Sequence, residues 1–176
     1  MYIDSNPYST RAQVIMLLLA TMHRLKGGNS KRRVIEEIES MSWFARQIED
    51  LTPYPTVSTE ARWKTLVAFR RKDCYEQELF EKDRIRDSWH ISKDGTNTFV
   101  IRRSQFASGE FDCRKCYMWS PAFKEFIDPA YVPSSEDADR PSNVYDDYYK
   151  RDQKIILNRL MERFSNPPIK EVEAEQ

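Results

Sequence analysis

The chain contains few side chains of the types that catalyse reactions or bind metal ions. Cys113 and Cys116 have the two-residue spacing of half a structural zinc site, which needs four ligands. Only Cys74, His23 and His90 could complete that set, and all three are distant in the sequence. We therefore predict reduced, partly buried thiols and no bound cofactor. Three cysteines, an odd number, also argue against a disulfide framework.

Acidic residues before and at the start of the last predicted helix form a second group that could hold a metal ion. A solvated loop, followed by the favourable placement of acidic residues at a helix N-terminus, explains the same pattern. The chain also has only two histidines, no Gly-x-Ser-x-Gly motif and no glycine-rich phosphate loop, so we expect no catalytic site. The acidic residues are Glu136, Asp137, Asp139, Asp146 and Asp147.

Basic residues are grouped in a way that suits a duplex DNA surface. They gather at residues 31–33, along 58–72 and at the charged tip 83–87. Phosphate binding needs cations on one surface. The alternative is a solvated helix whose carboxylates dilute the positive field. The predicted DNA contacts are Lys31, Arg32, Arg33, Ser58, Thr59, Arg62, Lys64, Arg70, Arg71, Lys72, Arg84 and Arg86.

Helical periodicity places most of these cations on two of three main helices. A nearly continuous apolar run predicts a largely buried helix over 10–26. A one-face apolar pattern predicts a second helix, capped by Asn29 or Ser30, with residues 31–33 in its first turn. A third helix is predicted over 58–77, with Arg70, Arg71 and Lys72 on its exposed side, and a short helix over 43–48 precedes it.

Two short strands are predicted after the third helix. Apolar and polar residues alternate over 80–82 and over 88–92, and 98–103 is a further extended candidate. Three helices followed by a hairpin is the order of a winged helix, in which the third helix enters the major groove. The predicted fold class is mainly α with a small β-hairpin, a winged helix-turn-helix with a C-terminal helical extension.

The predicted domain organisation is a winged-helix domain over 1–103, an irregular and helical extension over 104–165, and a disordered tail over 166–176. The extension contains a short helix near 122–127 and a longer one over 146–164. The apolar face of the longer helix is too large to stay in water, so it either folds back on the core or forms a dimer or partner interface. The residues predicted for that interface are Tyr149, Ile156, Leu160 and Phe164.

The composition is that of a folded chain with a densely ionic surface. Of its 176 residues, 40% are hydrophobic and 32% are charged, and the net charge is zero. Residues 1–103 contain 18 Lys and Arg against 14 Asp and Glu, and the remainder contains 10 against 14. This asymmetry fits either a nucleic-acid face on the first part or ordinary surface variation. The apolar run 14–20 is too short to span a bilayer and lacks a cleavage pattern, so we expect a cytoplasmic chain without membrane contact.

Core-type residues from the third helix to the second strand follow a family pattern. They are Trp63, Val67, Phe69, Cys74, Leu79, the run Trp89-His90-Ile91-Ser92 and Gly95. This pattern resembles the N-terminal winged-helix domain of Mrr-type restriction endonucleases, over about residues 11–97. Glu78 stands where the family usually has glycine, and Arg86-Asp87 stands in place of the Arg-Gly of its wing tip. The resemblance implies a module that reads DNA, and some related modules sense modified bases.

Three functional hypotheses follow. The first is a DNA-binding protein or subunit, which the resemblance places in a restriction or other defence system. It would be non-catalytic, because the sequence after Arg103 contains no Asp…Glu-x-Lys cluster. The second is a winged helix used as a scaffold subunit, favoured by the balanced charge and the aromatic-rich region 106–131. The third is a nuclease with an unrecognised site. The sequence leaves open the DNA sequence or modified-base preference, the oligomeric state, the identity of a protein partner, and whether Cys113 and Cys116 bind metal.

Overall fold

The structure is a computed structural model, and its described residues are mainly helical with one small antiparallel sheet. They are residues 5–26, 28–54, 60–82, 88–142, 144–145, 157–158 and 160–164. The elements are α1 (Thr10–Arg24), β1 (Gly28–Ser30), α2 (Lys31–Ser40), α3 (Ile48–Leu51), α4 (Arg62–Glu76), β2 (Ser88–His90), α5 (Lys93–Ala107), the 3₁₀ turn η1 (Cys113–Lys115) and α6 (Pro121–Ile127).

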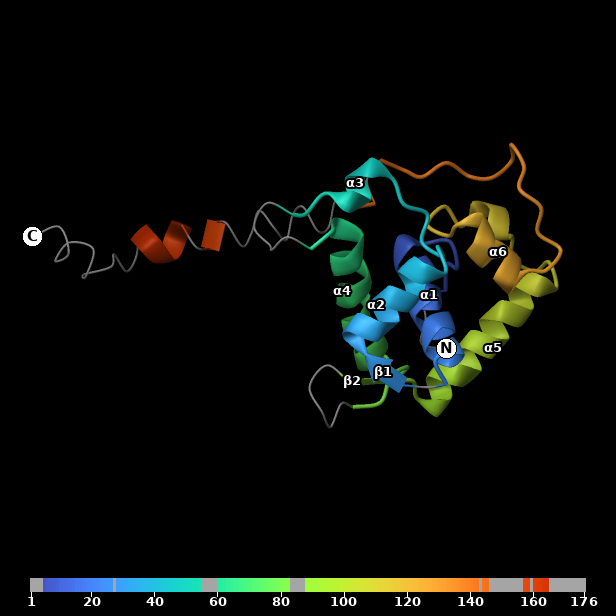
Figure 1. The fold of residues 1–176 in the computed structure, drawn as a ribbon, viewed down its shortest axis with the longest axis horizontal. Coiled ribbons are helices and arrows are strands. Elements are labelled where there is room, and N and C mark those ends of the chain that lie inside the picture. The colour runs from blue at the N-terminus through green and yellow to red at the C-terminus, as the bar shows by residue number, and fades with distance from the viewer. Residues whose placement is uncertain are drawn as a thin grey trace, which may run out of the picture.

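Helix α1 forms the centre of the fold, as its continuous apolar run predicted. Every residue from Ala12 to Met22 is buried, because α2, α4 and α5 all pack against this helix. Figure 1 shows α1 in the middle, with α2 and α4 on one side and α5 and α6 on the other. Ser9 caps the helix by accepting a hydrogen bond from the Ala12 amide at 3.0 Å.

The second and third predicted helices are present as α2 and α4, and Ser30 caps α2. The short helix predicted over 43–48 is wrong, because Phe44 instead pairs in extended conformation with Trp119. The Ala45 amide donates to the Met118 carbonyl at 2.9 Å, so tertiary pairing outweighs the local preference. The short helix α3 begins only at Ile48.

The extended segments after α4 lie antiparallel, but the sheet contains a strand that the sequence did not indicate. Phe80 forms an isolated bridge with Ile91, and the Glu81 amide donates to the His90 carbonyl at 2.8 Å. Strand β2 pairs along its other edge with β1, where Gly28 faces His90. The tip at 83–87 lies outside the described residues.

The further extended segment predicted over 98–103 is wrong, because these residues belong to α5. Ser92 caps this helix by accepting a hydrogen bond from the Gly95 amide at 2.9 Å. Phe99, Arg102 and Phe106 follow at helical spacing and are buried. The β-branched pair at 100–101, a residue type that favours strands, lies on the exposed side of the helix.

The C-terminal part of the body shares its core with α1. Helix α6 confirms the short helix predicted near 122–127. The Trp119 indole donates to the Gln13 carbonyl at 2.9 Å, and the Gln13 side chain accepts from the Met118 amide at 2.7 Å. Trp119 and Phe123 belong to the same buried cluster as the apolar side chains of α1. Within the described chain, no helix is long and apolar enough to cross a membrane.

Candidate functional site

The predicted DNA-reading helix, α4, turns one face into the core. Trp63, Leu66 and Val67 are buried there, and α4 packs against α1. Arg70 follows Trp63 by seven residues, or two helical turns, and is buried on the same face. Its predicted place on the exposed side is therefore wrong. Its Nη1 donates a hydrogen bond to Asp73 Oδ2 at 2.6 Å, so the buried charge is paired.

Arg62, at the start of α4, is also buried. Its guanidinium carbon lies 4.8 Å from the centre of the Tyr54 ring and 5.5 Å from that of Tyr145. Its Nη1 lies 3.5 Å from Glu49 Oε1. These aromatic and acidic neighbours hold the cation in place, so Arg62 cannot reach a phosphate in this conformation.

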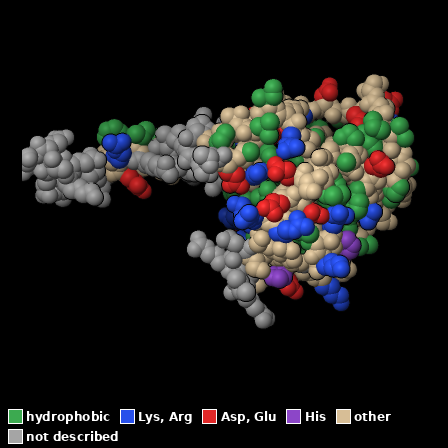
Figure 2. Space-filling model, viewed as in Figure 1, with side chains coloured by type: hydrophobic (Ala, Val, Ile, Leu, Met, Phe, Trp, Pro, Cys, Tyr) green, Lys and Arg blue, Asp and Glu red, His purple; other side chains and the backbone are tan. Residues whose placement is uncertain are grey.

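Five of the predicted DNA contacts keep accessible side chains on α2 and α4. Arg32 is the most exposed at 88%, followed by Lys72 at 68%. Each of the five also has a carboxylate within 4 Å, and Figure 2 shows blue basic and red acidic side chains interspersed over α2 and α4. The pairs are Lys31–Glu60 at 3.8 Å, Arg32–Glu36 at 3.0 Å, Arg33–Glu37 at 3.0 Å, Lys64–Glu39 at 3.8 Å and Lys72–Glu76 at 3.8 Å.

The strength of each ion pair and the other partners of its carboxylate determine how readily a cation could bind a phosphate instead. Exposed pairs such as Arg32–Glu36 hold each other weakly, by roughly 0.3–0.5 kcal/mol, so a phosphate competes with them easily. Glu37 is held more firmly, because Arg24 Nε donates to it at 2.6 Å and this hydrogen bond lowers the pKa of its carboxyl group. Arg32 and Lys72 are therefore more available to bind a phosphate than Arg33 is.

Arg71 connects α4 to the sheet. Its guanidinium carbon lies 5.2 Å from the Tyr75 ring centre and 5.6 Å from that of Trp89 in β2. The remaining predicted DNA contacts, Ser58, Thr59, Arg84 and Arg86, lie outside the described residues. Among the predicted partner-interface residues, Tyr149 and Ile156 also lie outside them, whereas Leu160 and Phe164 are described and exposed.

A buried polar cluster at the N-terminal end of α4 was not predicted. Asp50, on α3, accepts two hydrogen bonds from Arg140 Nη1, at 2.9 and 2.8 Å, and a third from the Tyr145 hydroxyl. Burial, reinforced by this hydrogen bond, raises the pKa of Tyr145. No local sequence signal could have found the cluster, because its members are about 90 residues apart. The cluster holds Arg140 and Tyr145 against α3 and the start of α4.

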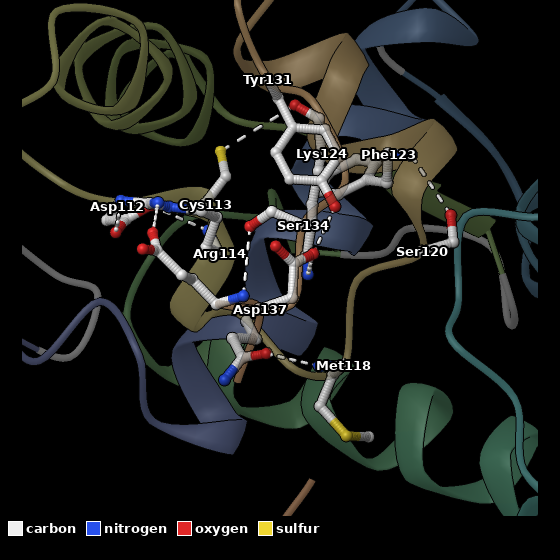
Figure 3. Close-up of polar contacts among 12 residues, drawn as sticks. Asp112, Cys113, Arg114, Met118, Ser120, Phe123, Lys124, Tyr131, Ser134 and Asp137 are labelled. Atoms are coloured by element: carbon white, nitrogen blue, oxygen red, sulfur yellow. Dashed lines mark hydrogen bonds and ion pairs between the residues drawn. The ribbon is translucent and has the colours of Figure 1, made fainter. Parts of the chain in front are cut away.

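A second polar cluster ties the 128–137 loop to η1 and α6 (Figure 3). Arg114 donates to Asp112 and to Glu136, and the Arg114 hydrogen bond lowers the pKa of Asp112. Asp137 accepts from Lys124 Nζ at 3.2 Å and from the Tyr131 hydroxyl. Burial raises the pKa of Tyr131, as does its hydrogen bond to Asp137.

A cavity of about 410 Å³ lies beside this cluster, lined by Gly109, Phe111, Asp112, Cys113, Arg114, Asp128, Ala130, Tyr131 and Val132. Arg114, which lines this cavity, already forms ion pairs with Asp112 and Glu136. We therefore infer that the cluster has a structural role, which is to hold the 128–137 loop in place.

Cys113, in η1, and Cys116, directly after it, are buried free thiols. Cys113 Sγ lies 3.9 Å from the Lys124 carbonyl oxygen, and burial raises the pKa of Cys113 to about 12. Burial also raises the pKa of Cys116. Among the described residues, no group of three or more His, Cys, Asp or Glu is placed to hold a metal ion.

No family model, no curated protein and no solved structure matches the chain. The candidate functional surface is the α2–α4 face, together with the extended segments that follow α4.

Proposed function

We propose that this chain is a winged-helix module that binds double-stranded DNA without catalysing a reaction. In this proposal α4 is the recognition helix, the first turn of α2 grips the phosphate backbone, and the chain after α4 forms the wing. The observation that carries the proposal is the order and pairing of the elements. Three main helices precede two antiparallel extended segments, and those segments begin directly after α4.

The pairing of the strands fits this topology in detail. Phe80 and Ile91 bridge the two arms of the proposed wing, and β1, between the first two helices, pairs with the second arm. In winged helices a short strand at this place completes a three-stranded sheet. The sheet lies at one end of α2 and α4 (Figure 1), so cations on both helices could face one duplex.

The end of α4 supports the resemblance to Mrr-type winged helices. Glu78, which stands where that family usually has glycine, has a φ of 61°, in the left-handed region that favours glycine. The Glu78 amide donates to the Tyr75 carbonyl and the Leu79 amide to the Cys74 carbonyl, which is the Schellman pattern of helix termination. The backbone here therefore has the conformation that the family residue would stabilise. By the same resemblance, the module would serve a restriction or other defence system.

Gly95 supports the same resemblance. A Cβ atom at this position would lie 2.1 Å from the Leu79 carbonyl oxygen, so the backbone after the wing packs too closely for any side chain. The glycine that the family pattern places after the Trp-x-Ile-Ser strand is therefore required sterically here.

Two observations favour the scaffold alternative, in which the same face binds a protein. The connection from Met41 to Ala61 contains α3 and exceeds the three- or four-residue turn of a helix-turn-helix. The accessible cations also share their surface with carboxylates, which suits a partner of mixed charge. The aromatic-rich region 106–131 gives this alternative no support, because Phe106, Trp119 and Phe123 are buried in the core.

Duplex binding followed by fluorescence anisotropy over a salt series tests the proposal. The informative variants are Arg32→Glu and Lys72→Glu, which reverse the most exposed charges of α2 and α4. Each should weaken binding of a labelled duplex of about 25 base pairs by roughly tenfold at low salt and reduce the salt slope by about one. Arg62 and Arg70 are poor choices, because their buried positions would confuse binding with folding.

The matched control is Lys115→Glu, which reverses an exposed charge on η1, beside α6. It should leave the affinity within about twofold of the native chain. Equal weakening by all three variants would indicate nonspecific attraction rather than a binding face on α2 and α4. The absence of binding at low salt would contradict the proposal and favour the protein-partner alternative.

A further inference from the structure

Two of the exposed apolar surfaces among the described residues lie on α3 and near the C-terminus. The first is on α3, where Ile48 and Leu51 are three residues apart and share a face. Ile48 is 86% exposed and Leu51 is 55% exposed. Figure 2 shows hydrophobic side chains over α3 at the edge of the body. Such a pair forms a small apolar patch that an apolar helix face could cover.

The second surface is on the helical residues 157–158 and 160–164 near the C-terminus, called the C-terminal segment below. Its apolar side chains are spaced at i, i+3, i+4 and i+7, so they form one face. All of them are exposed, up to 80% at Phe164, and Figure 2 shows them in green along one side of the segment. The side chains are Leu157, Leu160, Met161 and Phe164.

The Asp50 cluster determines which apolar surface of the body the C-terminal segment can reach most easily. Tyr145 donates its hydroxyl hydrogen bond to Asp50, which lies between Ile48 and Leu51 in the same short helix. The chain leading to the C-terminal segment therefore starts at α3. Eleven residues, 146–156, connect Tyr145 to Leu157.

A connection of this length keeps the segment near its starting point. Eleven residues span at most roughly 40 Å even when fully extended. The effective concentration of the segment at α3 is then in the millimolar range, well above the concentration of a second copy in dilute solution. The other exposed apolar pair in the described body, Val100 and Ile101, lies on α5, on the opposite side of α1 from α4 (Figure 1).

We propose that the C-terminal segment docks on the Ile48–Leu51 face of α3 in its own chain. The Arg140–Asp50–Tyr145 cluster acts as the anchor that holds the connecting chain at this site. The docked helix would lie next to the N-terminal end of α4, because α3 packs against α4. This inference is independent of whether that helix binds DNA.

Disulfide trapping in the full chain tests the docking. The test variant is Ile48→Cys with Leu160→Cys, and the control is Val132→Cys with Leu160→Cys, since Val132 is similarly exposed at 72%. All three native cysteines are buried, which keeps background crosslinking low. After mild oxidation of dilute protein, the test variant should form an intramolecular disulfide at least about tenfold faster than the control. Non-reducing electrophoresis separates this faster-migrating monomer from crosslinked dimers.

Two outcomes would overturn the proposal. Equal trapping rates in the test and control variants would mean that the segment has no preferred site on α3. A crosslinked dimer as the main product of the test variant would assign the face to the segment of a second copy. Both variants change only exposed residues, so loss of folding does not obscure either result.

Discussion

Arg140 and Asp50, 90 residues apart in the sequence, form a fully buried ion pair in which one guanidinium nitrogen contacts both carboxylate oxygens at 2.9 and 2.8 Å. Arg140 Nη2 also donates to the Ala45 carbonyl at 2.8 Å. The pair therefore joins the chain at Arg140 to residues 45–50, which precede α4. These hydrogen bonds satisfy both buried charges, and a buried charge is tolerated only when it is paired in this way. We call this ion pair a structural lock, because it holds two distant parts of the chain together.

Breaking this lock from one side should destabilise the protein strongly. In Asp50→Ala, Arg140 keeps a buried charge without its carboxylate, and the Tyr145 hydroxyl loses its acceptor. We expect the free energy of unfolding to fall by about 3–5 kcal/mol. Urea denaturation followed by tryptophan fluorescence measures this change.

Two controls separate a buried lock from an ordinary ion pair. Asp50→Leu combined with Arg140→Met removes both charges and should cost less than Asp50→Ala alone. Glu36→Ala, which breaks the exposed pair with Arg32, should change the free energy of unfolding by no more than about 0.5 kcal/mol. A loss in Asp50→Ala no larger than in Glu36→Ala would show that the ion pair does not hold these two parts of the chain together.

The parts of the fold that the sequence predicted are those with strong local signals. The continuous apolar run of α1 and the one-face pattern of α2 depend only on neighbours within two helical turns. Strand β1 was missed, because its three residues become a strand only by pairing with β2, about 60 residues later. Residues 98–103 were misassigned, because β-branched Val100 and Ile101 favour strands, whereas the cap at Ser92 starts a helix.

The candidate site was predictable only in part, for a similar reason. Residue type and helical spacing identified the cations of α2 and α4. They could not show that Arg62 lies between two aromatic rings, one of them from Tyr145, which is 83 positions away in the sequence. The partners of Lys31 and Lys64 also come from other segments, at Glu60 and Glu39. Burial and long-range pairing, which determine whether a cation is accessible, leave no trace in local patterns.

The hydrogen bond between Arg24 and Glu37 predicts a dependence of stability on pH. It lowers the folded-state pKa of Glu37 below its ordinary value of 4.5. Glu37 therefore stabilises the fold at pH values above the unfolded pKa, and this contribution is lost as the pH falls through the folded pKa. Glu37→Gln should flatten the decline in the free energy of unfolding below about pH 5, measured by urea denaturation over a pH series.

Arg24→Gln should reproduce part of this flattening, because Arg24 makes the largest contribution to lowering the pKa of Glu37. The second donor, Arg33, remains in that variant and preserves the rest. A Glu37→Gln variant whose stability declines with acid as steeply as the native chain would contradict the prediction.

The left-handed backbone at Glu78 predicts a stabilising substitution. Glu78→Gly removes the Cβ strain at a φ of 61° and keeps both terminating hydrogen bonds, which use backbone amides. Glycine also gives the unfolded chain more conformational freedom, which offsets part of this benefit, and the expected net gain in the free energy of unfolding is about 0.5–1 kcal/mol. Lys72→Gly, within α4, should instead cost about 1 kcal/mol. Thermal or urea denaturation of the two variants should show opposite signs, and a loss in Glu78→Gly would contradict the prediction.

The buried thiols predict very slow labelling of the native protein. Burial raises the pKa of Cys113 to about 12, so its thiol is protonated at pH 8, and Cys74 and Cys116 are fully buried. A disulfide exchange reagent such as DTNB should therefore leave all three cysteines unmodified for minutes in the native chain. It should react with three equivalents within seconds after denaturation. The exposed thiol of Val132→Cys, beside the same cavity, should react fast in the folded protein and serves as the positive control. Fast reaction of two native thiols would instead show that the η1 turn opens and exposes Cys113 and Cys116 together.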